Sequence, residues 1–161
     1  MVAADVLSPR VRELYPWPGE YLELDSGHRL HYLDEGEGRP VLMVHGNPTW
    51  SFYYRNLVRD LSDRYRCVAV DHMGCGLSDK PQDYDYSLAQ HVKNLSALIE
   101  ALGLEDITLV VHDWGGPIGL GAALEHSEKI TKIVIFNTGV FDGPLPLSIR
   151  MCRWPLLGPV L

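Results

Sequence analysis

Residues 107–116 read ITLVVHDWGG, and both the fold and the chemistry of the chain can be placed from this segment. Its first five residues are apolar or β-branched, which is typical of a short strand buried on both faces. The strand ends at Asp113 and Trp114, and glycines and a proline lead into a helix expected over residues 118–126. This strand–turn–helix order is the context of a nucleophile elbow. A carboxylate at the elbow, such as Asp113, attacks carbon directly and leaves an ester on the enzyme.

Asp113 has a second interpretation from this segment alone. An aspartate before two glycines is often only a turn residue or helix cap, because its oxygens accept backbone N–H groups. Other segments of the sequence are needed to decide whether Asp113 is a nucleophile or only a turn residue.

The composition indicates a single soluble globular domain. Of the 161 residues, 46% are hydrophobic and 22% are charged, and the net charge of −7 argues against nucleic acid or an anionic membrane as a partner. No run approaches the roughly 20 apolar residues of a membrane span, and the first ten residues lack the order of a secretory signal. The cysteines (Cys67, Cys75 and Cys152) lack metal-ligand spacing, so we expect reduced thiols in the cytoplasm, no metal ion and no cofactor.

Strands and helices alternate along the chain. Three prolines predict an irregular segment over residues 1–19, and a hairpin of two antiparallel strands is expected over residues 21–34. Further strands are expected over residues 39–44, 67–70, 107–111 and 130–136, the last of them buried, and helices over residues 50–61, 88–102 and 118–126, with Ser87 as N-cap and Gly103 as stop. This alternation predicts the α/β class, with a mostly parallel sheet and helices on both faces.

Polar side chains follow the ends of these strands. Asn47, Asp71, Asp113 and Asn137 each lie at or just past such an end. Ligands of open α/β sheets bind outside the carboxyl ends of the strands, so a site is expected there. Asp71 and the glycine-rich turn after it are more simply explained as scaffold.

Three segments carry a resemblance to a known family: HGNPTWSFYYR (residues 45–55), DHMGCGLSDKP (residues 71–81) and HDWGGPIG (residues 112–119). Together they resemble the amino-terminal half of an α/β-hydrolase, and specifically of a haloalkane dehalogenase, over about residues 21–142. Epoxide hydrolases share HDWGG. Asn47 separates the two groups, because many dehalogenases hold the departing halide with this asparagine, whereas epoxide hydrolases usually have an apolar residue there.

The resemblance implies the α/β-hydrolase fold and roles for three residues. Asp113 is the expected nucleophile. Asn47 and Trp114 are the expected halide-binding residues, since their amide and indole N–H groups hold an anion without losing a proton, and their backbone N–H groups form the expected oxyanion hole. The implied reaction converts a small haloalkane and water to an alcohol, a halide ion and a proton.

Alternatives remain open for the residues and for the activity. Trp114 could be a core aromatic residue, and Asn47 could be a plain turn residue before Pro48. An epoxide hydrolase and a non-catalytic fragment are the alternative functions.

A second half-reaction by water needs a histidine oriented by an acid, and in α/β-hydrolases both follow the nucleophile. Only His126 follows Asp113, and it lies ~18 Å along a helix that rises about 1.5 Å per residue. We therefore expect the triad histidine and acid to lie outside this chain, and a complementary C-terminal segment of the same enzyme as a partner. Residues 1–137 are expected to form the N-terminal part of the hydrolase core, and residues 138–161 the linker and the start of a cap domain.

Overall fold

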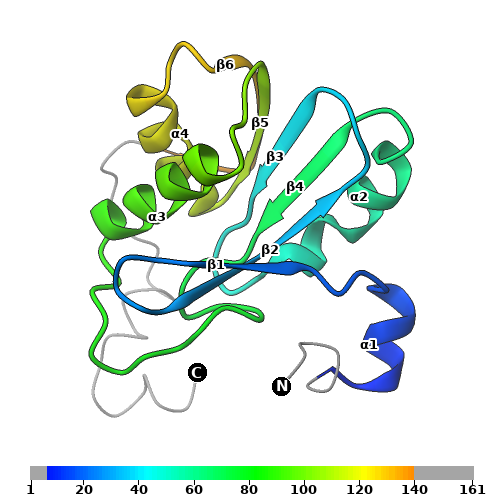
Figure 1. The fold of residues 1–161 in the computed structure, drawn as a ribbon, viewed down its shortest axis with the longest axis horizontal. Coiled ribbons are helices and arrows are strands. Elements are labelled where there is room, and N and C mark those ends of the chain that lie inside the picture. Colours follow the sequence, from blue (N-terminus) through cyan, green and yellow to red (C-terminus); the bar gives the residue numbers. More distant parts are fainter. Residues whose placement is uncertain (1–6, 140–161) are drawn as a thin grey trace.

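A computed structural model describes residues 7–139, which form a six-stranded sheet with helices on both faces (Figure 1). The strands are β1 (Glu20–Glu23), β2 (Arg29–Glu35), β3 (Pro40–Val44), β4 (Arg66–Val70), β5 (Ile107–His112) and β6 (Ile130–Phe136). The helices are α1 (Pro9–Leu14), the 3-10 helix η2 (Ser51–Tyr54), α2 (Arg55–Leu61), α3 (Leu88–Ala101) and α4 (Gly115–Glu125). Within the described residues, every helix is too short or too polar to cross a bilayer.

The sheet has the spatial order β1-β2-β4-β3-β5-β6. The strands β4, β3, β5 and β6 run parallel, while β1 and β2 pair antiparallel at one edge. Parallel strands end at the same side of the sheet, so the loops that follow β3, β4 and β5 meet there. The predicted α/β class and mostly parallel sheet are confirmed.

Alternate residues of the central strands enter two separate cores. On β3, Leu42 and Val44 belong to the core under α3 and α4, while Val41 and Met43 belong to the core under α2. Successive side chains of a strand point to opposite faces, so a strand covered on both sides must be apolar throughout. This burial explains the unbroken apolar runs of β3 and β5.

Two helix boundaries differ from the predicted ones. Residues 9–14 are helical rather than irregular. The Ser8 hydroxyl caps the helix by accepting the N–H of Val11. Pro9 lies in the first turn of the helix, where a backbone N–H would have no partner within the helix, so the lack of one in proline costs nothing. For the same reason α4 begins at Gly115, ahead of Pro117. Proline is compatible with a helix start, and treating it only as a breaker was wrong here.

Within residues 7–139 the strand β6 is exposed, so the prediction that it is buried is wrong for this part of the chain. Four consecutive apolar residues, Ile133, Val134, Ile135 and Phe136, are 38% to 58% exposed. β6 pairs only with β5, and in the described part of the chain no further strand or helix covers it. A sequence pattern indicates that a strand can be buried, but its neighbours determine whether it is.

A buried carboxylate joins the loops around the sheet end. Asp71 follows β4, is fully buried, and accepts the N–H groups of Ser51 (2.7 Å) and Leu77 (2.8 Å) and Nδ1–H of His31 (2.9 Å). Burial raises the pKa of Asp71, but the hydrogen bond and charge of His31 and the two backbone N–H groups outweigh it and lower the pKa overall. These contacts make Asp71 a scaffold residue, in agreement with the simpler interpretation of the sequence.

Replacing Asp71 by Asn should lower the free energy of unfolding by about 3 kcal/mol at neutral pH, because an amide cannot accept three converging donors. The folded pKa of Asp71 lies below its ordinary value of 3.8. Its stabilising effect is therefore present above that value and is lost as the pH falls through the folded pKa. Urea unfolding between neutral and acidic pH should show the difference from the parent shrinking in acid.

The exposed carboxylate of Asp60 provides the matched control, and Asp60→Asn should change stability by less than about 0.5 kcal/mol. If Asp71→Asn lowered the free energy of unfolding by the same amount in neutral and in acidic solution, this account would be contradicted.

Candidate active site

Asp113 lies on a sharp turn between β5 and α4. Its φ is +51°, in the left-handed region that residues other than glycine seldom adopt. Positions 115 and 116 leave no room for side chains, since a Cβ on Gly115 would collide with the carbonyl oxygen of Val44 and one on Gly116 with the side chain of Thr138. The glycines therefore allow α4 to start directly against the end of β3. The turn has the strained, exposed geometry expected of a nucleophile elbow.

One oxygen of the Asp113 carboxylate is held by the neighbouring loop. Oδ1 accepts the backbone N–H of Asn47 at 2.9 Å, from the loop that follows β3. Gly46 permits this approach, because a Cβ there would collide with the Asp113 side chain. Among residues 7–139, Oδ2 has no hydrogen-bond partner, and the backbone N–H of Trp114 does not bond to the carboxylate. Of the two backbone N–H groups expected to form an oxyanion hole, that of Asn47 therefore contacts the carboxylate and that of Trp114 does not.

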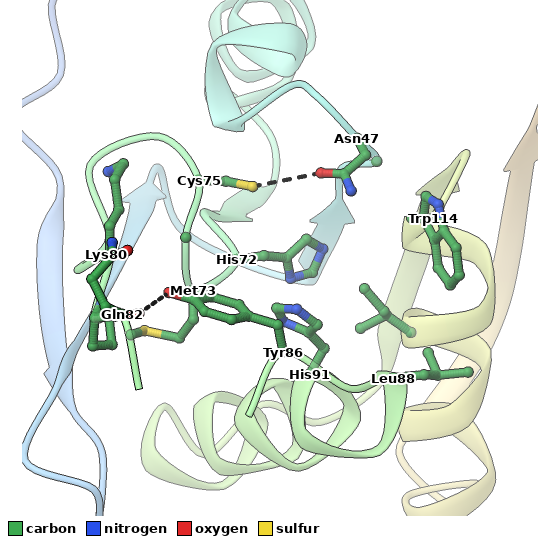
Figure 2. Close-up of a pocket in the computed structure, with 14 residues that line it drawn as sticks. Asn47, His72, Met73, Cys75, Lys80, Gln82, Tyr86, Leu88, His91 and Trp114 are labelled. Carbon is green, nitrogen blue, oxygen red and sulfur yellow. Dashed lines mark hydrogen bonds between the residues drawn. The ribbon is translucent and has the colours of Figure 1, made fainter. Parts of the chain in front are cut away.

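A cavity of about 560 Å³ opens at this end of the sheet (Figure 2). Asn47 and Trp114 both line it, together with residues of the loop after β4 and of α3. The cavity is also lined by His72, Cys75, Tyr86, Leu88 and His91. Trp114 is 51% exposed, so it is not a core aromatic residue. The structure therefore brings Asn47, Asp113 and Trp114 together at one edge of the sheet.

Histidines line and support one wall of the cavity. His45 is fully buried, and its Nε2 accepts the backbone N–H of His72 (3.0 Å), while Nε2–H of His72 donates to the carbonyl oxygen of His45 (3.0 Å). Burial lowers the pKa of His45, and burial with the neighbouring imidazoles of His45 and His91 lowers the pKa of His72 further. Both rings are therefore neutral at neutral pH, and they tie the loop after β3 to the loop after β4.

His72, Cys75 and His91 are site residues that the sequence analysis did not single out. No periodic pattern marks His72 and Cys75, which lie in a turn interpreted as scaffold. His91 lies in the predicted helix over residues 88–102, one turn after its N-cap Ser87. Its position on the helix face toward the cavity depends on how α3 packs on the sheet.

Other candidate residues lie away from the cavity. His112 stacks on Tyr53 (ring centroids 4.6 Å apart), on the opposite side of the strand from the cavity, as the alternation of β5 predicts. His126 ends α4 at the end remote from Asp113. No three His, Cys, Asp or Glu side chains of residues 7–139 are grouped so as to hold a metal ion. The predicted linker and cap segment, residues 138–161, lies outside the described residues except for its first two.

Comparisons with known proteins identify the family of the chain. Residues 39–151 match the family model described as the alpha/beta hydrolase fold. A cis-3-alkyl-4-alkyloxetan-2-one decarboxylase of Shewanella oneidensis is 54% identical over 92% of this chain and 48% of its own length. Haloalkane dehalogenase 2 of Mycobacterium tuberculosis is 41% identical over 78% of this chain and 44% of its own length.

Among solved structures, the haloalkane dehalogenase DpaA from Paraglaciecola agarilytica superposes with a TM-score of 0.78 and 32% identity, covering 88% of this chain and 52% of that one. The chain thus spans about half the length of the relatives it matches. The predicted resemblance to haloalkane dehalogenases is confirmed, while the similarity to oxetanone decarboxylases was not foreseen. The chain belongs to the alpha/beta hydrolase fold family.

Proposed function

We propose that Asp113 is a nucleophile that attacks an sp³ carbon of a small substrate, expels an anionic leaving group and carries the alkyl group as an ester. The observation that supports this is the 2.9 Å hydrogen bond from the Asn47 N–H to Oδ1. It orients the carboxylate, leaves Oδ2 without a hydrogen-bond partner among residues 7–139, and joins Asp113 to Asn47, which lines the cavity. A fixed nucleophile next to a substrate cavity supplies the proximity and alignment that an in-line displacement requires.

The leaving anion is held, in this proposal, by the side chains of Asn47 and Trp114. Both line the same cavity, and both carry N–H donors on neutral groups. Such donors stabilise negative charge as it develops without transferring a proton to the anion. A departing halide ion and a departing carboxylate oxygen can both accept hydrogen bonds from these N–H groups, so the two donors fit two classes of substrate.

The first candidate substrate is a cis-3-alkyl-4-alkyloxetan-2-one, the substrate named for the 54% identical relative. Asp113 Oδ2 attacks C4, the C4–O bond of the ring breaks, and the ring oxygen leaves as a carboxylate. The bond from C3 to that carboxylate then breaks as carbon dioxide departs, and its electron pair forms the alkene between C3 and C4. The C4–O bond to Asp113 breaks in the same step, so the free aspartate returns without water.

The second candidate substrate is a haloalkane, favoured by the pairing of Asn47 with Trp114 and by the 41% identical dehalogenase. Here the halide leaves, and water hydrolyses the ester to an alcohol, a proton and the free aspartate. This step needs a base oriented by an acid, which we propose is supplied by polypeptide outside residues 7–139. Neither the epoxide hydrolase nor the non-catalytic alternative has a comparable observation in its favour.

The exposed β6 strand supports the proposed complementary segment. Its apolar side chains are exposed on both faces of the sheet edge, and a groove of about 320 Å³ beside it is lined by Val110, Val134 and Phe136, with Arg39 and Lys132 at its rim. A strand added along β6, with an amphipathic helix that places acidic residues near the two cations, would cover this surface. Since the relatives are about twice as long, we propose that their C-terminal half has a counterpart here.

The two candidate substrates can be separated with the longest natural polypeptide that contains this chain, assayed in oxygen-18 water. With a cis-3,4-dialkyl oxetan-2-one we expect alkene and carbon dioxide, and no isotope in the Asp113 peptide, because no water attacks the ester. Turnover of haloalkanes with isotope in that peptide, and none of the lactone, would replace the first candidate by the second.

In the same assay Asp113→Asn should lower the rate at least about a thousandfold, since it removes the nucleophile. Asp106 offers a matched control, because it lies before the start of β5, also has a positive φ (+55°), and is exposed. Asp106→Asn should retain the parent rate within about twofold. An Asp113→Asn variant as active as Asp106→Asn would contradict the proposal for both substrate classes.

Trp114→Phe keeps an aromatic ring but removes the indole N–H, so we expect the rate of ester formation to fall roughly a hundred- to a thousandfold. Rapid-quench measurement of the released anion reports this step. Tyr86→Phe is the control, since Tyr86 also lines the cavity but its hydroxyl donates to the carbonyl oxygen of Pro81. Equal rates for Trp114→Phe, Tyr86→Phe and the parent would remove Trp114 from the leaving-group site.

A further inference from the structure

The terminal amide of Asn47 has to take one of two orientations for the proposed function to work. Rotation by 180° about the last side-chain bond exchanges its oxygen and its nitrogen, which are similar in size. Only Nδ2 can donate to a departing anion, and an oxygen in the same place would repel it. Asn47 is exposed at the cavity rim, so packing alone does not select the productive orientation.

A thiol contacts the oxygen side of this amide. Cys75 Sγ lies 3.8 Å from Asn47 Oδ1, in the geometry of an S–H donor to a carbonyl acceptor. Figure 2 shows the amide oxygen turned toward Cys75 and the amide nitrogen turned away from it. The contact joins residues 28 positions apart, which come from the loops after β3 and β4.

The loop that carries Cys75 holds the thiol in a fixed place. Cys75 lies between Gly74 (φ +86°) and Gly76 (φ +50°), and a Cβ on either glycine would collide, with the ring of Tyr86 or the carboxylate of Asp71. The backbone N–H of Cys75 donates to the carbonyl oxygen of His72 at 2.9 Å. The thiol position is therefore set by the same buried carboxylate that ties together the loops of the site.

Cys75 remains a hydrogen-bond donor at neutral pH. Burial and the negative charge of Asp71 raise the pKa of the Cys75 thiol, against a smaller opposite effect of Lys80. Only the protonated thiol can donate to the amide oxygen; a thiolate would attract the NH₂ group instead and turn it away from the substrate. The surroundings of Cys75 thus favour the form that selects the productive amide.

We propose that Cys75 is a positioning residue, whose S–H donates to Asn47 Oδ1 and thereby keeps Nδ2 of Asn47 directed at the leaving anion. This inference rests on the proposed function, in which Asn47 holds that anion. It gives the thiol an effect on the rate of ester formation although the sulfur touches no reacting atom.

The kinetic test compares Cys75→Ala with Cys75→Ser in the longest natural polypeptide that contains the chain. Both variants remove the sulfur and its volume, but only serine keeps a donor. We expect Cys75→Ala to lower kcat for release of the leaving anion about three- to tenfold with KM unchanged, and Cys75→Ser to recover most of the rate. In an Asn47→Leu background, Cys75→Ala and Cys75→Ser should have the same kcat. Equal rates for Cys75→Ala and Cys75→Ser in the parent background would overturn the positioning role.

A second readout does not depend on catalysis. The pKa of the Cys75 thiol can be measured from the pH dependence of its alkylation by iodoacetamide, in a Cys152→Ser background, since Cys67 is fully buried. Asn47→Leu keeps the bulk of the side chain and removes the acceptor, so the pKa of Cys75 should fall. An unchanged pKa would overturn the contact itself. A lowered pKa in a protein that forms no Asp113 ester would leave the contact standing and count against the proposed function alone.

Discussion

The hydrogen bond from the Asn47 N–H to Asp113 Oδ1 is the contact on which the candidate site depends. β3 and β5 are parallel neighbours, so their ends bring Asn47 and Asp113 to one place. Glycine at positions 46 and 115 permits the approach, because a Cβ at either position would collide with the facing loop. The left-handed φ of Asp113 costs on the order of 1 kcal/mol, which the tight packing of the turn has to offset. The backbone thus directs the carboxylate as much as the residue type does.

A buried polar network holds these loops from behind. Asp71 joins the segments that contain Ser51 and Leu77, and His45 joins the ends of β3 and β4 through its two hydrogen bonds with His72. A satisfied network of this kind rigidifies its surroundings, and the proposed role of Asp113 as a nucleophile would benefit from that rigidity. The residues facing the substrate and the residues supporting them therefore belong to the same loops.

Local sequence patterns predicted most of the fold, and the polar residues at the strand ends predicted where the candidate site lies. The elbow after β5, the Ser87 cap of α3 and the proximity of Asn47 to Asp113 followed from local sequence and from the rule that parallel strands end at one side of the sheet. The exposure of β6 could not be predicted, because it depends on what lies beside the strand. The contact of Cys75 with Asn47 could not be predicted either, since it exists only through the spatial order of β3 and β4.

Both candidate substrates share one first step, and trapping its product tests the account most directly. The longest natural polypeptide that contains the chain would be mixed separately with a bromoalkane and with a cis-3,4-dialkyl oxetan-2-one, quenched in acid and digested for mass spectrometry. The account predicts an alkyl group on the peptide that contains Asp113, absent from the Asp113→Asn variant. Folded protein in which that peptide stays unmodified, or carries the same alkyl group in both proteins, would contradict it.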